Sequence, residues 1–402
     1  MTRMKLFSIW PCKHFGLICI TALLLAGFCF GQAANSRSNW TEFHRTNMMR
    51  FNPYEKVLGV HNVHGLSLRW SETLGAGVWS SPAVVDGVVY IAADYADNSV
   101  FALNARTGAT LWKYTTGAEI YSSPAVVNGV VYIGSDDRNV YALNAKTGAK
   151  LWSYTANGYV RSSPAVANGV VYVGSDDDNV YALDAKTGAK LWSYTTRGPV
   201  YSSPAVANGM VYVGSYDGNV YALDAHTGAN LWSYTTGADV QSSPAVAKGV
   251  IYVGSDDRNV YALNAKTGAK LWSYTANGYV SSSPAVANGV VYVAIYDSQY
   301  ADGVVAALDA HNGSRLWSYE TGAYYSYSSP AVANGVVYVG TSGYDVNGAV
   351  FALDARTGAE LWFYGFGGCV CSSPVVVKGM LYVGEVDITY QDFYAFGLVR
   401  KR

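Results

Sequence analysis

The residues that could do chemistry stand at two positions that vary within an otherwise repeated sequence. The tripeptide Ser-Ser-Pro, as in Ser122-Ser123-Pro124, recurs every 40–46 residues along most of the chain. The residue just before it changes from copy to copy: Trp79, Tyr121, Arg161, Tyr201, Gln241, Ser281, Tyr327 and Cys371. So does the residue two positions earlier: Gly77, Glu119, Tyr159, Pro199, Asp239, Tyr279, Tyr325 and Cys369. Aromatic rings with polar and charged groups beside them are typical of binding surfaces.

These side chains do not form a recognisable catalytic set. The sequence shows no nucleophile with an accompanying base, no glycine-rich phosphate loop and no metal-ligand spacing. Acidic loops such as Asp176-Asp177-Asp178-Asn179 lack the ligand spacing of a calcium loop. We therefore expect recognition rather than catalysis, and no cofactor or metal. Neutral drift at solvent-exposed positions is the competing explanation of the variation.

The composition limits the possible partners. The 402 residues carry a formal net charge of −1, and half of them are hydrophobic. A nucleic-acid-binding protein needs a basic face, so nucleic acid is not expected as the main partner. A small molecule, a glycan or a protein remains possible, and we expect the chain to be a monomer.

The N-terminus has the features of an export signal. Arg3, Lys5 and Lys13 precede or flank an apolar stretch over residues 15–30, and small residues follow at 31–33. This predicts a signal peptide over residues 1–33, a periplasmic or secreted protein, and no membrane span after cleavage. An uncleaved anchor is the alternative, although a span requires about 20 residues. Cys29 follows Phe28, so lipidation is not expected. Cys369 and Cys371 would then be the remaining cysteines, either reduced or joined to each other.

The elements that must position the variable residues are short β-strands. In one repeat they are predicted at 163–167, 170–174, 180–183 and 189–195. Asn168-Gly169 lies between the first two, and Asn-Gly is a strong hairpin signal because both turn residues need positive φ. Four strands in about 40 residues indicate a blade of a β-propeller, an all-β fold. A parallel β-helix is disfavoured, because its rungs are shorter and its neighbouring strands are parallel.

The ends of the repeat predict how the ring closes. There are eight Ser-Ser-Pro copies, but the last unit stops after its third strand, and residues 66–70 match a fourth strand with nothing before it. This predicts an eight-bladed propeller over residues 66–402, with four-stranded antiparallel blades and the N-terminal strand pairing with the C-terminal blade. Closure removes exposed strand edges. Residues 34–65 are predicted to be a lead-in segment that wraps the propeller.

Both variable positions should begin the innermost strand of a blade and so form the rim of the central channel on one face. The loops between second and third strands open on the same face. They are longer in blades one, six, seven and eight, where they add Tyr95, Tyr296, Tyr300, Asp302, Tyr344, Asp345, Tyr390 and Asp392. The opposite face, built from turns that hardly change, is expected to be inert.

The repeat resembles a known family. Ala182, Asp184, Gly188 and Trp192 follow the pattern Ala-x-Asp/Asn-x-x-x-Gly-x-x-x-Trp, which resembles the tryptophan-docking motif of quinoprotein propellers. That family includes the pyrroloquinoline quinone (PQQ) dependent alcohol dehydrogenases and the outer-membrane assembly protein BamB. The resemblance covers residues 66–402 and implies eight blades with tryptophans docked between neighbours. The matching residues here are Trp70, Trp112, Trp152, Trp192, Trp232, Trp272, Trp317 and Trp362.

The family that the repeat resembles contains both enzymes and assembly proteins, so the resemblance implies more than one function. The dehydrogenases would bind PQQ and calcium under a pair of adjacent cysteines, whereas this chain has Cys369-Val370-Cys371. A fold of this kind also supports many unrelated functions. We therefore expect an exported, non-catalytic binding or assembly scaffold with its ligand at the channel mouth. A PQQ-dependent periplasmic alcohol dehydrogenase is the alternative, and a BamB-like outer-membrane assembly factor is a further one.

Overall fold

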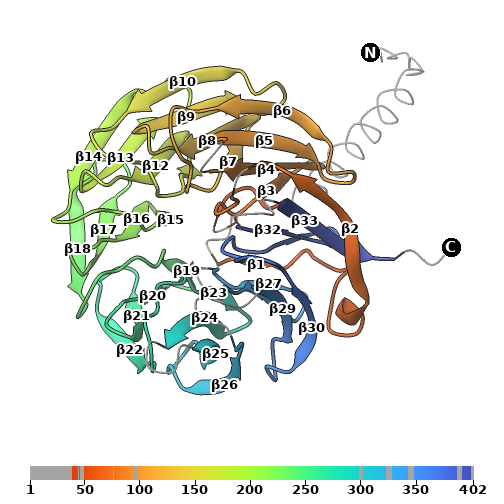
Figure 1. The fold of residues 1–402 in the computed structure, drawn as a ribbon. Helices are drawn as coiled ribbons and strands as arrows, with labels where there is room; N and C mark the ends of the chain where they lie inside the picture. Colours follow the sequence, from red (N-terminus) through yellow and green to blue (C-terminus); the bar gives the residue numbers. More distant parts are fainter. Residues whose placement is uncertain are drawn as a thin grey trace, which may run out of the picture.

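The computed structural model describes residues 39–43, 45, 49–75, 77–94, 97–297, 302–322, 328–342, 348–386 and 392–399. In these residues the chain forms eight antiparallel sheets arranged in a ring (Figure 1). One short 3-10 helix, η1 (Val63–Gly65), precedes the first blade. The first strands of neighbouring blades contact one another and surround the centre of the ring. The predicted all-β, eight-bladed architecture is confirmed.

The first four blades share the same order of four short strands. Blade one contains β3 (Ala83–Val85), β4 (Val88–Ala93), β5 (Ser99–Asn104) and β6 (Thr110–Thr115). Blade two contains β7 (Ala125–Val127), β8 (Val130–Gly134), β9 (Asn139–Asn144) and β10 (Lys150–Thr155). Blade three contains β11 (Ala165–Ala167), β12 (Val170–Gly174), β13 (Asn179–Asp184) and β14 (Lys190–Thr195). Blade four contains β15 (Ala205–Ala207), β16 (Met210–Gly214), β17 (Asn219–Asp224) and β18 (Asn230–Thr235).

The remaining blades follow the same order. Blade five contains β19 (Ala245–Ala247), β20 (Val250–Gly254), β21 (Asn259–Asn264) and β22 (Lys270–Thr275). Blade six contains β23 (Ala285–Ala287), β24 (Val290–Asp297), β25 (Asp302–Asp309) and β26 (Arg315–Glu320). Blade seven contains β27 (Ala331–Ala333), β28 (Val336–Gly340), β29 (Ala349–Asp354) and β30 (Glu360–Gly365). Blade eight contains β31 (Val375–Val377), β32 (Met380–Gly384), β33 (Asp392–Leu398) and β2 (Leu66–Thr73).

The Asn-Gly turns set the blade register. Asn168 has φ 51° and Gly169 has φ 78°, the conformation that this hairpin turn requires. β11 and β12 consequently pair with Ala165 opposite Tyr172 and Ala167 opposite Val170. The same turn recurs in the other blades, so each blade begins with the same hairpin.

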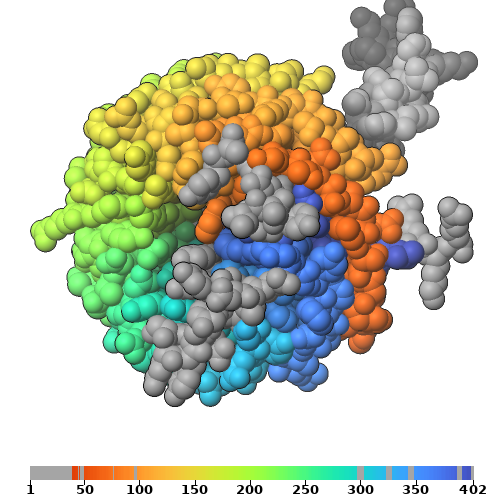
Figure 2. All heavy atoms as spheres, viewed as in Figure 1, coloured from red at the N-terminus to blue at the C-terminus, as the bar shows by residue number. Residues whose placement is uncertain are grey.

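The ring closes through the N-terminal strand. β2 pairs antiparallel with β33 from Leu66 opposite Leu398 to Thr73 opposite Asp392. In the face view the blue last blade lies beside the orange first blade (Figure 2). Residues from the two ends of the chain therefore complete one sheet, as the repeat count predicted, and β33 is covered by β2.

The repeated tryptophans lie between blades. Trp192 of blade three donates from its indole Nε1 to the carbonyl of Ala225 in blade four, at 3.1 Å. Its ring covers Gly228, where an added Cβ would come within 2.7 Å of the ring. The same donation to the next blade is made by Trp70, Trp112, Trp152, Trp192, Trp232, Trp272 and Trp317. Trp362 instead packs edge-on against Phe396, at 5.4 Å between ring centroids, because the next blade is the one completed by the two chain ends.

The lead-in segment lies along the inner strands instead of wrapping the outside. Trp40 exchanges two backbone hydrogen bonds with Val84 of β3, and Thr41 accepts one from Val126 of β7. Farther along, β1 (Phe51–Asn52) runs parallel to β27. The inner strands keep unpaired backbone groups toward the axis, and this segment satisfies several of them. The segment thus follows the inner strands of several blades, a path that the prediction of a wrapping lead-in did not specify.

The lead-in carries a buried guanidinium into the centre of the ring. Arg50 is fully buried and donates to the carbonyls of Pro330, Phe43, Ser329 and Pro374. Burial lowers its pKa to about 9. Carbonyl acceptors from two blades thus hold the segment in place.

Candidate functional site

The variable positions and the loops between second and third strands meet on one face of the ring. In blade two the carbonyl of Glu119 accepts a hydrogen bond from the backbone N–H of Asp136, at 2.9 Å. In blade three Tyr159 accepts from Asp176 in the same way. Both variable positions lie before the inner strand, since β7 begins only at Ala125, so the prediction that they begin that strand is corrected. We call the residues at the two variable positions, together with the loop residues that face them, the rim.

The rim contains residues that the sequence analysis missed. They lie just after the end of the second strand: Asp94, Asp136, Asp176, Tyr216, Asp256 and Val386. This position also varies between blades, so the comparison that identified the other two positions could have found it. Its proximity to them depends on the fold, because it is about 15 residues farther along the chain.

A rule connects neighbouring blades at the rim. In three blades the residue before Ser-Ser-Pro bonds the residue at this loop position of the preceding blade, 25 positions earlier. Tyr201 donates from its hydroxyl to Asp176 at 3.3 Å. Ser281 donates to Asp256 at 2.7 Å, and Gln241 donates to the other oxygen of that carboxylate, also at 2.7 Å.

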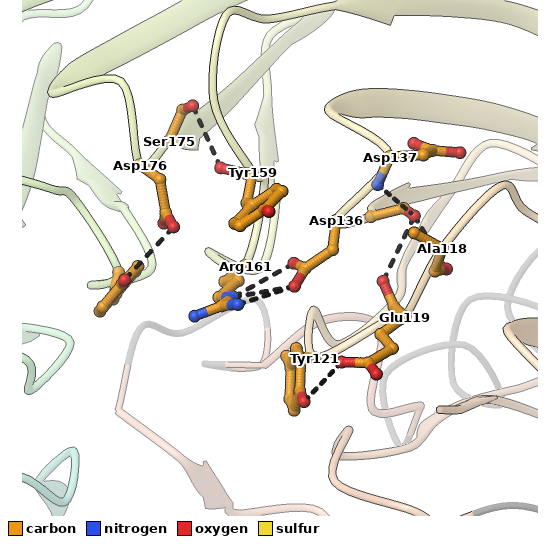
Figure 3. Close-up of polar contacts among 11 residues, drawn as sticks. Ala118, Glu119, Tyr121, Asp136, Asp137, Tyr159, Arg161, Ser175 and Asp176 are labelled. Carbon is orange, nitrogen blue, oxygen red and sulfur yellow. Dashed lines mark hydrogen bonds and ion pairs between the residues drawn. The ribbon is translucent and has the colours of Figure 1, made fainter. Parts of the chain in front are cut away.

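Arg161 makes the strongest of these contacts. Its Nη2 lies 2.8 Å from Asp136 Oδ2, and its Nε donates to both carboxylate oxygens of Asp136 (Figure 3). The guanidinium also lies over three rings, with its Cζ 5.1 Å from the centroids of Tyr121 and Tyr159 and 5.7 Å from that of Tyr201. Such faces attract a cation through the ring quadrupole. The rim thus holds a guanidinium by one carboxylate and several aromatic faces.

The Arg161 charge also acts on the next carboxylate. Burial raises the pKa of Asp176 to about 6, and the opposing pull of Arg161 and the Tyr201 hydroxyl limits that rise. Tyr201 is packed edge-on against Tyr216, at 4.6 Å between centroids. We call Tyr121, Asp136, Tyr159, Arg161, Asp176 and Tyr201 the Arg161 sector.

Asp94 of blade one breaks the cross-blade rule. Its counterpart in blade two is Tyr121, and that hydroxyl donates instead to Glu119, at 2.8 Å (Figure 3). Asp94 is 0% exposed, and neither of its carboxylate oxygens has a hydrogen-bond partner among the described residues. Burial, then the charges of Glu119 and Asp136, raise its pKa to about 7. We call Trp79, Asp94, Glu119 and Tyr121 the Asp94 sector; Trp79 and Tyr121 are in edge-on contact at 6.1 Å.

The rest of the rim is less charged or lies outside the described residues. Tyr279 and Tyr296 of blade six face each other at 6.2 Å between centroids. Burial, with Asp256 nearby, raises the pKa of Asp239. Cys369 and Cys371 are joined by a disulfide with Cα atoms 5.4 Å apart. The predicted rim residues Tyr325 and Tyr327, and Tyr95, Tyr300, Tyr344, Asp345 and Tyr390 of the longer loops, lie outside the described residues, as does the predicted signal peptide.

Two open cavities lie on opposite faces. One of about 660 Å³ is on the rim face and is lined by Asp136, Tyr159, Asp176 and their loop neighbours. A larger one, about 920 Å³, lies on the opposite face at the seam between blades eight and one, beside Arg69, Arg106 and Lys378. The rim is the better candidate site, because its residues differ between blades that are otherwise copies. The larger cavity lies where the lead-in and the strands from the two chain ends meet turns of blades one and eight.

The described residues do not fit a metal-supported quinone site. Within them, no three His, Cys, Asp or Glu side chains converge in a way that could hold a metal ion. The same part of the chain contains no helix long and apolar enough to cross a membrane.

Comparisons with known proteins agree with the fold. The family model described as outer membrane protein assembly factor BamB matches residues 61–162, 157–244, 235–362 and 301–395. No curated protein matches the chain. Among solved structures, quinohemoprotein alcohol dehydrogenase from Comamonas testosteroni is similar at 18% identity and a TM-score of 0.79, covering 93% of this chain and 82% of the other.

Two further solved structures give the same result. Quinohemoprotein alcohol dehydrogenase ADHIIG from Pseudomonas putida HK5 is 19% identical with a TM-score of 0.78, covering 92% of this chain and 82% of that one. BamB from Moraxella catarrhalis is 20% identical with a TM-score of 0.70, covering 83% and 99%. At these identities the likeness establishes the fold alone. The family match spans nearly all of the repeats, so the chain belongs to the outer membrane protein assembly factor BamB family of β-propellers.

Proposed function

We propose that this protein is an exported, non-catalytic binding scaffold whose ligand or partner is recognised at the rim. One observation carries the proposal. The residues that differ between nearly identical blades gather on a single face and bond one another across blades, as Arg161 does with Asp136. Repetition supplies a rigid ring, and the rim carries strong chemical differences among the described parts of the blades.

The chemistry of the rim favours recognition. Tyr159 and Tyr279 are 46% and 39% exposed, so both rings can be reached from solvent. Aromatic residues with a polar handle, and arginines, dominate the binding energy of many interfaces. The ligand classes that suit this surface are a small molecule, a glycan or a peptide segment of a protein.

A PQQ-dependent dehydrogenase is the second candidate, supported by the similarity to two quinohemoprotein alcohol dehydrogenases. A metal ion beside a quinone would supply charge stabilisation that protein groups must hold in place. Reconstitution with PQQ and calcium, followed by a dye-linked alcohol assay, tests this candidate. Turnover that is lost on chelation would replace the scaffold proposal. A BamB-like assembly role follows from the family match and predicts retention of outer-membrane assembly proteins.

The scaffold proposal is tested by capture. Immobilised protein is exposed to an extract of its native cells, and retained small molecules, glycans and proteins are identified by mass spectrometry. We expect Trp79→Ala with Tyr201→Ala to abolish capture, because losing a hot-spot aromatic costs about 2 kcal/mol or more, roughly 30-fold in affinity.

The matched control lies on the opposite face. Lys146→Ala with Lys186→Ala changes exposed residues beside repeated turns and should leave capture intact. Equal melting temperatures of both double variants would show that the ring is intact. If the lysine variant lost capture and the rim variant kept it, the ligand would bind on the opposite face and the proposal would be contradicted.

A further inference from the structure

The most unusual group on the rim is the Asp94 carboxylate. It is fully buried, yet no described hydrogen-bond donor reaches either of its oxygens. Burying a charge without a partner is costly, so native proteins pair such groups or bind something to them. The donor expected from the cross-blade rule is Tyr121, and its single hydroxyl proton is given to Glu119. The site therefore needs a cation or a proton from outside this set of residues.

The local sequence makes room for this carboxylate. Gly77 occupies the variable position that holds Glu119 in blade two and Tyr159 in blade three. A Cβ at Gly77 would come within 2.9 Å of Asp94 Oδ1 and 3.1 Å of a methyl group of Val386. A side chain at that position would thus crowd Asp94.

The Arg161 sector shows how this same rim binds a cation. There a guanidinium is held by the carboxylate of Asp136 and by the faces of Tyr121, Tyr159 and Tyr201. The Asp94 sector has the matching parts: a buried carboxylate, a second carboxylate in Glu119, and the rings of Trp79 and Tyr121, which are partly exposed. Arg161 is the one basic residue at the described rim positions, and its charge is already engaged by Asp136.

We propose that Asp94, Glu119, Trp79 and Tyr121 form a subsite for the organic ammonium group of the ligand, with Asp94 as its anionic anchor. This inference rests on the proposed function, because it assigns a chemical feature to the ligand bound at the rim. An ammonium group donates several hydrogen bonds to carboxylates and is attracted to the faces of aromatic rings. A negatively charged ligand group would be repelled by Asp94 and Glu119.

An ammonium group fits better than a metal ion. A calcium or magnesium ion needs six or more oxygen ligands in a defined geometry. The described residues provide no group of three convergent ligands, and aromatic rings supply none. A primary amine can use one carboxylate and ring faces, as Arg161 already does in the neighbouring sector.

The test uses benzylamine, which is a cation at pH 8, and benzyl alcohol as its neutral counterpart of similar shape. Binding to the full chain is measured by saturation-transfer NMR titration at millimolar concentrations. We expect benzylamine to bind, benzyl alcohol to bind at least about tenfold more weakly, and Asp94→Asn to weaken benzylamine by about tenfold or more. Benzyl alcohol binding should be the same in the variant and the native chain.

The matched control is Asp256→Asn, because that carboxylate lies on the same rim but already accepts bonds from Gln241 and Ser281. It should leave benzylamine affinity unchanged. Unaltered affinity in Asp94→Asn, equal binding of the alcohol, or no benzylamine binding to the native chain would each overturn the proposal. Displacement of benzylamine by micromolar calcium would also overturn it and assign the sector to a metal ion.

Failure here is distinguishable from failure of the proposed function. If Trp79→Ala with Tyr201→Ala abolishes capture while Asp94→Asn leaves both capture and benzylamine binding unchanged, the rim binds its ligand without this subsite. If neither variant changes capture, the rim itself is not the binding surface.

Discussion

Arg161 and Asp94 lie in neighbouring sectors of the same rim, and each is an ionisable side chain that is partly or fully buried. Arg161 meets a bidentate carboxylate in Asp136 and three aromatic faces. Asp94 meets like charges, since Glu119 and Asp136 both raise its pKa, and its oxygens accept no hydrogen bond from a described residue. The two residues belong to blades of the same repeat, although the loop that begins at Asp94 is longer than those of blades two and three.

Two substitutions accompany the difference, beside a loop that is longer in blade one than in blade two. Blade three has arginine where blade two has Tyr121, so Asp136 gains a cation that Asp94 lacks. Blade two has Glu119 two positions before Tyr121, and it accepts the tyrosine proton. A repeated scaffold can therefore place a satisfied charge and an unsatisfied charge side by side by changing only a few side chains.

The largest expected effect comes from opening the ring that holds both sectors in place. Deleting residues 66–73, which form β2, would leave β33 without its partner and would remove Trp70, whose ring covers Gly108. Loss of a large core aromatic alone costs about 3–5 kcal/mol, a large share of the stability of most domains. Thermal unfolding and size-exclusion chromatography should show a strongly lowered melting temperature and association through the open edge. A monomeric deletion variant with unchanged melting would contradict closure by this strand.

The next effect comes from removing the Arg161 guanidinium, so that Asp136, like Asp94, has no cation beside it. Arg161→Ala leaves the Asp136 carboxylate without its cation. Removing one partner of a fully buried pair costs about 3–5 kcal/mol, but the Arg161 side chain is 34% exposed. We therefore expect chemical denaturation at pH 8 to show a loss of about 1–3 kcal/mol.

Arg161→Lys is the control for charge alone. It keeps the cation but not the bidentate geometry, so its stability should lie between those of the native chain and the alanine variant. Addition of Asp136→Asn to Arg161→Ala should recover part of the loss. Equal stability of the native and alanine chains would show that the pair contributes nothing.

The third effect comes from replacing Asp94 by a neutral side chain, which we expect to raise the stability instead of lowering it. A carboxyl with a raised folded-state pKa holds its proton where the unfolded chain has released it, so its stabilising effect is lost between about pH 4 and pH 7. Asp94→Asn carries no such dependence. We expect the variant to be more stable than the native chain at pH 8, by about 1–3 kcal/mol, and nearly equal at pH 4.

Denaturation curves at several pH values measure this difference directly. Burial also raises the pKa of Glu42 to about 7, but Glu42 is present in both chains and its contribution cancels in the comparison. Asp256→Asn is the matched control and should not stabilise the protein at pH 8, because it removes an acceptor that is in use. A stabilisation by Asp94→Asn that is the same at pH 4 and pH 8 would refute the titration of this group as its cause.

The smallest expected effect is that of a substitution far from the rim, and it tests whether changes in stability and benzylamine affinity are specific to rim residues. Lys146→Ala alters an exposed side chain beside a repeated turn on the opposite face. Its stability should change by no more than about 0.5 kcal/mol, and benzylamine affinity should not change. A larger effect on benzylamine binding would move the cation subsite away from Asp94.

Much of the architecture followed from local patterns in the sequence. Asn168-Gly169 predicts a hairpin because of the φ values it allows, and the observed turn has them. The incomplete last unit and the unmatched strand at 66–70 predicted the closure that β2 and β33 make. Each of these conclusions depends on residues that are close in sequence or on the count of repeats.

The contents of the rim were only partly predictable. Arg161 and Glu119 were identified by their variation, but Asp94 and Asp136 were missed, although their position varies too. Which of these side chains face one another depends on how consecutive blades are placed. The path of the lead-in along the inner strands could not be predicted for a related reason, since the inner-strand groups that it satisfies come together only when the ring has formed.

By itself the sequence determined the number of blades, the strand order, the turns and the set of positions free to vary, because a repeat imposes the same local geometry on every copy. Only the tertiary structure decided which charges are satisfied. Tyr121 has one proton and two candidate carboxylates, Glu119 in its own blade and Asp94 in the preceding one, and the folded geometry gives that proton to Glu119. Hydrogen bonds and burial depend on distances between blades, and these are fixed when the ring closes.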